Sequence, residues 1–142
     1  MTRTEIDLAL ARAMVASALV EATASGALVS AAVVDAGGHL IAFERMDGAE
    51  IAGPVLAPDK AFTAVAHRIA THELAPLVAP GGPLVGMNAA AGGRYVCFAG
   101  GLPLWSDDRV VGGIGVSGGT AEQDLAASSA ALAVYEGREE VG

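Results

Sequence analysis

Lys60 is the only lysine of the chain, and its surroundings make it the first candidate for chemistry. It stands in an alanine-rich stretch with a helical pattern, and Thr63, His67 and Thr71 follow at intervals of three and four residues. Residues at these intervals share one face of a helix. A lysine shielded in an apolar pocket has a lowered pKa and can act as an acid or base. The alternative interpretation is a solvated helix face from which the lysine reaches into water.

Asp35 and Arg45 are charged residues near the ends of two apolar, β-branched segments. A charge among apolar neighbours usually has a partner, which here is either the other residue or a ligand. Antiparallel pairing about the turn AGGH at 36–39 places the two at different heights, so a direct bond between them is not guaranteed. A desolvated aspartate has a raised pKa, which makes Asp35 the second acid or base candidate.

The segment VVGGIGVSGGTAEQD at 110–124 contains the spacing G-x-G-x-x-G of a dinucleotide-binding turn. Such a turn needs a helix and then a second parallel strand, and only one helix fits between Gly119 and the last residue, Gly142. A phosphate-binding Walker loop is excluded too, because no Lys-Ser or Lys-Thr pair follows the glycines. We therefore reject a nucleotide site here.

Strand alternation explains these glycines better. Gly113, Gly115 and Ser117 share one face of the expected strand, so a helix or a ligand can approach its backbone closely. Ser117, Gly118 and Gly119 then lead into a helix whose free N–H groups favour an anionic group. The alternative is a tight strand-to-helix turn that Thr120 alone caps.

The histidines and the cysteine carry weaker signals. His67 and His72 are five residues apart, which turns them away from each other on a helix, so we predict no metal site. His39 follows the turn glycines and is typical of a surface turn. Cys97 lies in an apolar run and is expected to be a buried thiol. The G-x-S-x-G motif of a nucleophile elbow does not occur in the chain.

These residues need a framework of helices and strands. Thr2 and Glu5 have the spacing of a capping box for a first helix that ends at Gly26. We expect the other elements at Val29–Asp35 and His39–Met46 (a hairpin), at 58 to about 74 (a helix), at 80–93 (a long loop), at 94–99, 102–105 and 110–117 (strands), and at about 120–136 (a helix). The order α-β-β-α-β-β-β-α indicates an α+β fold with an antiparallel sheet flanked by helices.

Composition limits the classes of partner. The 142 residues fit a single domain over 1–142, and the net charge of −8 argues against nucleic acid and anionic membranes. The chain is 53% hydrophobic but only 4% aromatic, and its many alanines favour a homo-oligomer. The acidic N-terminus does not look like a signal peptide, and no apolar run reaches the ~18 residues of a membrane span. We expect a cytoplasmic protein.

Four segments in the same order resemble the GlcG/HbpS family, which also occurs as the C-terminal domain of PduO-type proteins and is often labelled haem-binding or haem-degrading. The segments are VVDAGGHLIAFERMDGA at 33–49, KAFTAVAHRIAT at 60–71, AGGLPL at 99–104 and VVGGIGVSGGTAEQD at 110–124. They cover most of the chain. Before the last strand, where the family usually has Asp-Gly, this chain has Asp107, Asp108 and Arg109.

The resemblance implies a profilin- or PAS-like fold, assembly from dimers up to octamers, and small-molecule pockets near subunit interfaces. It nominates as pocket residues Asp35, Arg45, Lys60, Ser117, Gly118 and Gly119. Haem is the cofactor that it suggests, although the family's haem binders share no single axial ligand. His39 and His67 are haem-ligand candidates by their chemistry alone.

Three hypotheses follow. The first is an oligomeric binding protein for an anionic small molecule, either haem or a small hydroxy- or oxo-acid. Lys60, Arg45 and the helix start at 117–119 would bind this ligand. The second is a cofactor-free lyase, isomerase or hydrolase that acts on a small carboxylate with Lys60 or Asp35 as acid or base. The third is a scaffold protein whose pocket is vestigial.

Overall fold

A computed structural model of the chain describes residues 6–138 and contains one four-stranded sheet. The strands are β1 (Ser30–Asp35), β2 (Leu40–Arg45), β3 (Gly101–Ser106) and β4 (Arg109–Ser117). They lie in the order β2-β1-β4-β3, and all three pairings are antiparallel. Each outer strand is joined to its neighbour by a hairpin, so the sheet consists of two hairpins held together by β1 and β4.

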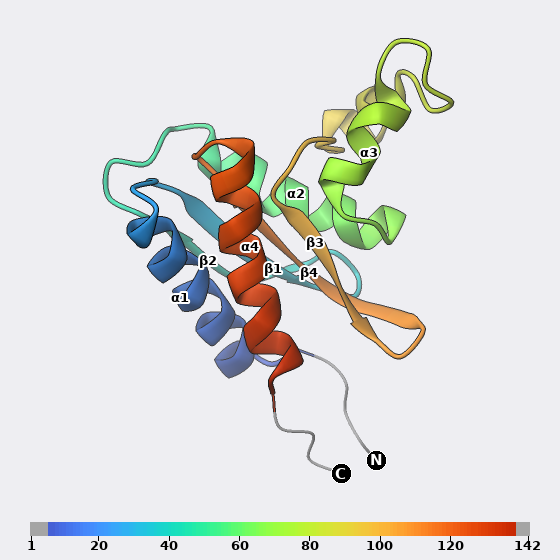
Figure 1. Cartoon of the computed structure of the whole chain (residues 1–142). Coiled ribbons are helices and arrows are strands. Elements are labelled where there is room, and N and C mark those ends of the chain that lie inside the picture. The colour runs from blue at the N-terminus through green and yellow to red at the C-terminus, as the bar shows by residue number, and fades with distance from the viewer. Residues whose placement is uncertain (1–5, 139–142) are drawn as a thin grey trace.

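Two long helices cover one face of this sheet (Figure 1). They are α1 (Leu8–Ala24) and α4 (Ala121–Glu136), which pack side by side. Half of their buried residues are alanine, which lets the two backbones approach each other. The core between these helices and the sheet includes Val33, Ile114 and Val116. Asp7 caps α1 by accepting a hydrogen bond from Leu10. The predicted cap by Thr2 and Glu5 lies outside the described residues.

Helix α2 (Gly53–His67) packs on the other face of the sheet. A Cβ atom at Gly115 would clash with the carbonyl oxygen of Ala57, and one at Gly113 would lie 2.6 Å from that of Ala61. These two glycines therefore form the bare strip on which α2 rests. Of the two expected explanations for the strip, the structure places a helix there.

The expected helix from 58 to about 74 is wrong in its bounds. The chain enters α2 at Gly53, because Pro54 already suits a first turn, and it leaves the helix at Arg68, which has a φ of 55°. A separate helix, α3 (Thr71–Val78), follows and leads into the predicted loop, which contains the short 3-10 turns η1 (Met87–Ala89) and η2 (Ala91–Gly93). Figure 1 shows α3 and this loop projecting from the body of the molecule.

Residues 94–99 form no strand, so the sheet has four strands where five were expected. Side chains of the helices take the place of strand partners for this segment. Thr63 accepts a hydrogen bond from the Val96 N–H at 2.9 Å, and Thr71 donates one to the Phe98 carbonyl at 2.6 Å. The segment is thus tied to α2 and α3 instead of to a neighbouring strand.

The predicted fold class is confirmed: the chain has an α+β fold whose antiparallel sheet is flanked by helices. The capping box of Thr120 and Gln123 at the start of α4 is also present. None of the helices in the described part of the chain is both long and apolar enough to cross a membrane.

Candidate functional site

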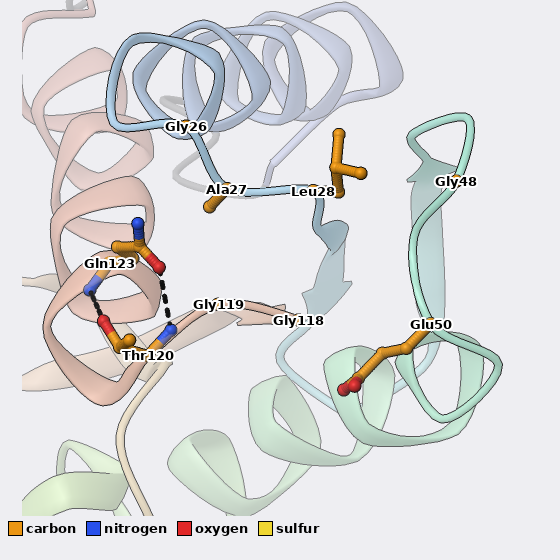
Figure 2. Close-up of a pocket in the computed structure, with 9 residues that line it drawn as sticks. All are labelled: Gly26, Ala27, Leu28, Gly48, Glu50, Gly118, Gly119, Thr120 and Gln123. Atoms are coloured by element: carbon orange, nitrogen blue, oxygen red, sulfur yellow. Dashed lines mark hydrogen bonds between the residues drawn. The ribbon is translucent and has the colours of Figure 1, made fainter.

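An open pocket of about 490 Å³ lies where α1 ends and α4 begins. Three segments line it (Figure 2): Gly26 to Leu28 after α1, the β2–α2 loop at Gly48 and Glu50, and the β4–α4 junction from Gly118 to Gln123. Most of these residues have small side chains or none, so backbone forms much of the wall. A pocket of this size can take a small organic ligand.

Gln123 joins two walls of this pocket. Its side-chain oxygen accepts a hydrogen bond from the Thr120 N–H at 3.0 Å, and its side-chain nitrogen donates to the Ser25 carbonyl at 3.0 Å. The first turn of α4 is therefore attached to the last turn of α1. Because both partners are backbone atoms, this attachment sets the width of the pocket at that side.

Lys60 lies below the β4–α4 junction and has no exposed surface. Its Nζ donates to the Val116 carbonyl at 2.9 Å and to Asp124 Oδ2 at 3.2 Å, and it lies 4.8 Å from the centre of the Phe98 ring. Burial lowers the pKa of Lys60, and the nearby Asp124 carboxylate opposes that effect. Of the two expected interpretations, the solvated helix face is excluded.

Asp124 is the partner that our sequence reasoning missed. Its Oδ1 accepts a hydrogen bond from the Gly119 N–H at 2.9 Å while Oδ2 binds Lys60, and burial raises the pKa of its carboxyl. The signal was present in the sequence, because Asp124 lies in register with the buried stripe Ala127, Ser128, Ala131 and Tyr135 of α4. An acid on an apolar stripe needs a partner, and the chain has a single lysine to offer.

The structure brings the predicted residues Lys60, Ser117, Gly118 and Gly119 together at this junction. Ser117 is buried. Gly118 has a φ of 136°, and it packs against the carbonyl oxygen of Leu28. The backbone N–H of Gly119 already binds an anion of the chain itself, the Asp124 carboxylate. Arg45 lies at the same end of the sheet, because Ser30 of β1 pairs with Arg45 on one side and with Ser117 on the other. The Arg45 residue is exposed.

Asp35 and His39 lie at the opposite end of β1. Asp35 is five residues beyond Ser30 along the strand, about 16 Å away, so it does not meet Lys60. Its Oδ1 accepts hydrogen bonds from the N–H groups of Gly37 and His39, both at 2.9 Å. In the structure Asp35 therefore organises the β1–β2 turn, and the His39 side chain is exposed there.

His67 lies near the end of α2, where its ring meets Tyr95 edge-on with 4.4 Å between ring centres. Its Nε2 atom is buried without a hydrogen-bond partner. Tyr95 also stacks with Phe62, whose ring carries the Arg94 guanidinium at 3.7 Å. Within residues 6–138, no cluster of three histidine, cysteine or acidic side chains is arranged to hold a metal ion.

Comparison with known proteins identifies relatives over nearly the whole chain. A family model described as "Haem degrading protein HbpS-like" matches residues 6–133. The corrinoid adenosyltransferase PduO of Salmonella typhimurium is 44% identical over 105 residues, which are 74% of this chain and 31% of PduO. The chain thus spans about a third of the length of that relative.

Two solved structures have the same fold. The crystal structure of the Klebsiella pneumoniae protein ORFY matches with a TM-score of 0.91 and 36% identity, over 94% of this chain and 92% of that one. A crystal structure of a PduOC:heme complex matches with a TM-score of 0.88 and 37% identity, over 92% of this chain and 94% of that one. The similarity therefore concerns the complete fold and not one motif.

Proposed function

The chain belongs to the HbpS-like family, as its resemblance to GlcG/HbpS predicted, and from this premise we propose that it is a small-molecule-binding protein whose ligand is haem. The observation that carries the proposal is the likeness to the PduOC:heme complex across 92% of this chain. A haem offers an iron, a flat apolar ring and two carboxylates, so its site needs an iron ligand, apolar surface and positive charge. The described chain has exposed apolar side chains such as Leu40 and an exposed cation, Arg45, and its histidines are candidate iron ligands.

The direct test is a titration of the purified protein with haemin, followed by visible absorption. We expect a saturable shift of the Soret band at one haem per chain or per subunit pair. Iron-free protoporphyrin in a parallel titration separates iron ligation from contact with the ring. Absence of any saturable spectral change with haemin would overturn the proposal.

A small hydroxy- or oxo-acid is the second ligand class that we propose. It would bind at the pocket beside Gly118 and Gly119, with Arg45 as the nearby exposed cation. Haem is the better supported of the two, because Lys60 is already paired with Asp124 and Glu50 brings negative charge to the pocket. Native mass spectrometry of the protein as isolated would reveal a retained acid. Arg45→Ala and Lys60→Ala should weaken its binding, and unchanged affinity in both would contradict this site.

A cofactor-free lyase, isomerase or hydrolase is the second function, and one observation favours it. Lys60 combines a lowered pKa with a carboxylate at 3.2 Å, which is an arrangement suited to proton transfer. Asp35 supports this function less, because both hydrogen bonds of its Oδ1 hold the turn. A panel of small carboxylates incubated with apo-protein tests for turnover. No turnover, or turnover unchanged in Lys60→Met, would exclude Lys60 as the acid or base.

We also propose a homo-oligomer that acts in the cytoplasm. Large apolar side chains at the start of α2 support the oligomer, because Ile51 is 91% exposed and Val55 is 63% exposed in the single chain. The acidic, lysine-poor composition fits a partner other than nucleic acid. Cell fractionation with an antibody tests the location, and native mass spectrometry tests the number of subunits.

A further inference from the structure

The chain between the start of α3 and the segment before β3 has a long stretch without charge. Between Glu73 and Arg94 lie 20 residues, 74–93, that include no charged side chain, and no other run in the sequence is as long. Alanine, glycine, leucine, proline and valine make up most of this stretch. A long loop in a compact domain is usually functional or interfacial, so this one needs an explanation.

Residues 79–93, which we call the arm, have a defined backbone but no core of their own. The Leu84 N–H donates to the Leu77 carbonyl of α3, and the Gly82 N–H donates to the Ala79 carbonyl, both at 2.8 Å. A Cβ atom at Gly82 would clash with the Leu77 carbonyl oxygen, so the arm doubles back tightly on α3. None of the arm residues is buried. Local turns therefore hold the arm in shape while its side chains stay in solvent.

The arm stands apart from the rest of the molecule. Figure 1 shows it projecting from the body beyond the end of α3. Within residues 6–138, α3 is the only other helix or strand to which the arm is hydrogen-bonded. Leu84 is 41% exposed and Val85 is 62% exposed. Two adjacent large apolar side chains on an uncharged, projecting segment indicate a surface that binds another molecule.

Ile51 and Val55 form a second uncovered surface, which we call the apolar patch. Ile51 is 91% exposed and Val55 is 63% exposed, at the start of α2. Glu50, the residue before Ile51, is exposed as well. A surface that carries acidic residues would be repelled by Glu50, whereas an uncharged segment would not.

A second copy of this chain is the partner that these two surfaces fit. Each copy has a net charge of −8, so two copies repel each other least where the contact has no charge. The exposed side chains of Leu8, Val20 and Trp105 each have an acidic residue within two positions, and they would bring like charge to Glu50. The arm brings none. The cores of protein interfaces are depleted of charge in the same way.

The size of the arm agrees with this partner. A stable interface uses about 20–30 residues from each side. The arm alone supplies 15 residues. Because the arm and the apolar patch are different surfaces of one chain, a two-fold axis would use the contact twice, and each copy would then contribute both surfaces.

From these observations, and resting on the proposed homo-oligomer, we infer that the arm of one copy docks on the apolar patch of a second copy. Leu84 and Val85 would contact Ile51 and Val55 of that copy. This assignment explains why the longest uncharged run of an acidic chain has an ordered shape although it covers no core of its own. It also gives the exposed residues at the start of α2 a defined cover.

The first test measures the subunit number of Leu84→Asp/Val85→Asp by native mass spectrometry. We expect the dissociation constant of the oligomer to rise about tenfold or more for each lost contact. The matched control is Leu8→Asp/Val20→Asp, which adds the same charge to exposed positions of α1 and should leave the subunit number unchanged. Far-UV circular dichroism confirms that both variants are folded, as expected for substitutions at exposed residues.

The second test is disulfide trapping between copies. In a Cys97→Ala background, Val85→Cys and Ile51→Cys chains are co-expressed and then oxidised under mild conditions. We expect a cross-linked dimer that contains one chain of each kind, because a disulfide forms only where the two Cα atoms lie within about 7 Å. Co-expression of Val85→Cys with Val20→Cys is the control and should give no such dimer. Mass spectrometry of the cross-linked peptides identifies the joined positions.

The outcomes separate the two levels of the proposal. If the unaltered protein is a single chain, the proposed homo-oligomer fails and this inference fails with it. If the unaltered protein is an oligomer and Leu84→Asp/Val85→Asp keeps its subunit number, only the role of the arm is overturned. Dissociation by that variant without a cross-link between positions 85 and 51 would overturn the apolar patch as the docking site.

Discussion

At the scale of single residues, the Lys60–Asp124 pair determines how the β4–α4 junction is built. Both side chains are almost completely removed from water, and each also binds backbone: Lys60 the Val116 carbonyl and Asp124 the Gly119 N–H. Neither charge can be lost alone without leaving the other buried and unpaired. The pair therefore connects α2, β4 and α4 under the wall of the pocket.

We predict that Lys60→Met lowers the free energy of unfolding by about 3–5 kcal/mol, because it leaves the Asp124 carboxylate without its cation. The double variant Lys60→Met/Asp124→Leu should recover more than half of that loss, since both buried charges are then gone. Urea denaturation followed by circular dichroism measures both. Arg94→Met is the control, because its pair with Asp59 is half exposed and should be worth less than about 1 kcal/mol. Equal losses in Lys60→Met and Arg94→Met would contradict the prediction.

The pH dependence of stability should report the burial of Asp124. Burial raises the pKa of its carboxyl above the ordinary value of 3.8, so the folded protein holds that proton more tightly than the unfolded chain does. The resulting stabilisation is complete below 3.8 and is lost as the pH rises through the folded-state pKa. The free energy of unfolding relative to Asp124→Asn should therefore fall as the pH is raised from acid. A difference that grows with pH would show that the Lys60 charge outweighs burial.

At the scale of elements, the contact between β4 and α2 depends on the absence of side chains. Gly113 and Gly115 let α2 approach β4 closely. The side chains of Lys60 and Thr63 then reach the chain segment that precedes β3. That segment consists of residues 94–99, which Thr63 and Thr71 hold by hydrogen bonds to the backbone of Val96 and Phe98. The polar stripe of the helices thus serves as an anchor for a chain segment that lacks strand partners.

Gly115→Ala should reduce the free energy of unfolding by at least about 3 kcal/mol, the upper end of the usual cost of overpacking. The reason is that its Cβ atom would meet the Ala57 carbonyl and Ala61 nitrogen, which are backbone atoms that cannot rotate away. Thermal or urea unfolding measures the loss. Gly137→Ala is a matched control, because it ends α4 with a φ of −86° and its nearest neighbour would be 3.3 Å away. A similar small effect at both positions would mean that α2 moves to make room.

At the scale of the whole molecule, the start of α2 presents two neighbouring large apolar side chains to solvent. Ile51 and Val55 are among the most exposed large hydrophobic residues of the described chain. In a protein with a net charge of −8, neighbouring apolar residues at this exposure favour contact with another copy over exposure to water. The projecting α3 and its loop enlarge the surface available for such a contact (Figure 1).

The double variant Ile51→Asp/Val55→Asp should therefore dissociate the proposed homo-oligomer into smaller species. Two added negative charges would be buried at the contact, which is costly without partners. Native mass spectrometry or light scattering gives the subunit number. Val20→Asp is the control, since Val20 is 70% exposed but lies on α1, on the other side of the sheet. Dissociation by Val20→Asp alone would move the interface to α1.

Local patterns predicted much of the framework. Apolar periodicity and turn glycines placed the first hairpin within one residue of β1 and β2, and the capping box placed the start of α4. Alternation in the last strand correctly put Gly113, Gly115 and Ser117 on one face. The end of α2 could not be predicted in the same way, because Arg68 adopts a left-handed conformation that ends the helix. The absence of a strand at 94–99 could not be predicted either, because the side chain of the distant Thr63 binds that backbone.

The sequence by itself determined the family, the antiparallel α+β architecture and the residue types available for binding. These properties follow from local periodicity and from motifs whose letters are adjacent in the chain. Only the tertiary structure decided which charges meet. It paired Lys60 with Asp124, 64 positions apart, and it separated both from Asp35 and His39 at the other end of β1. Such pairings depend on the register of the strands and on the packing of the helices. Both depend on contacts between residues that are far apart in the sequence.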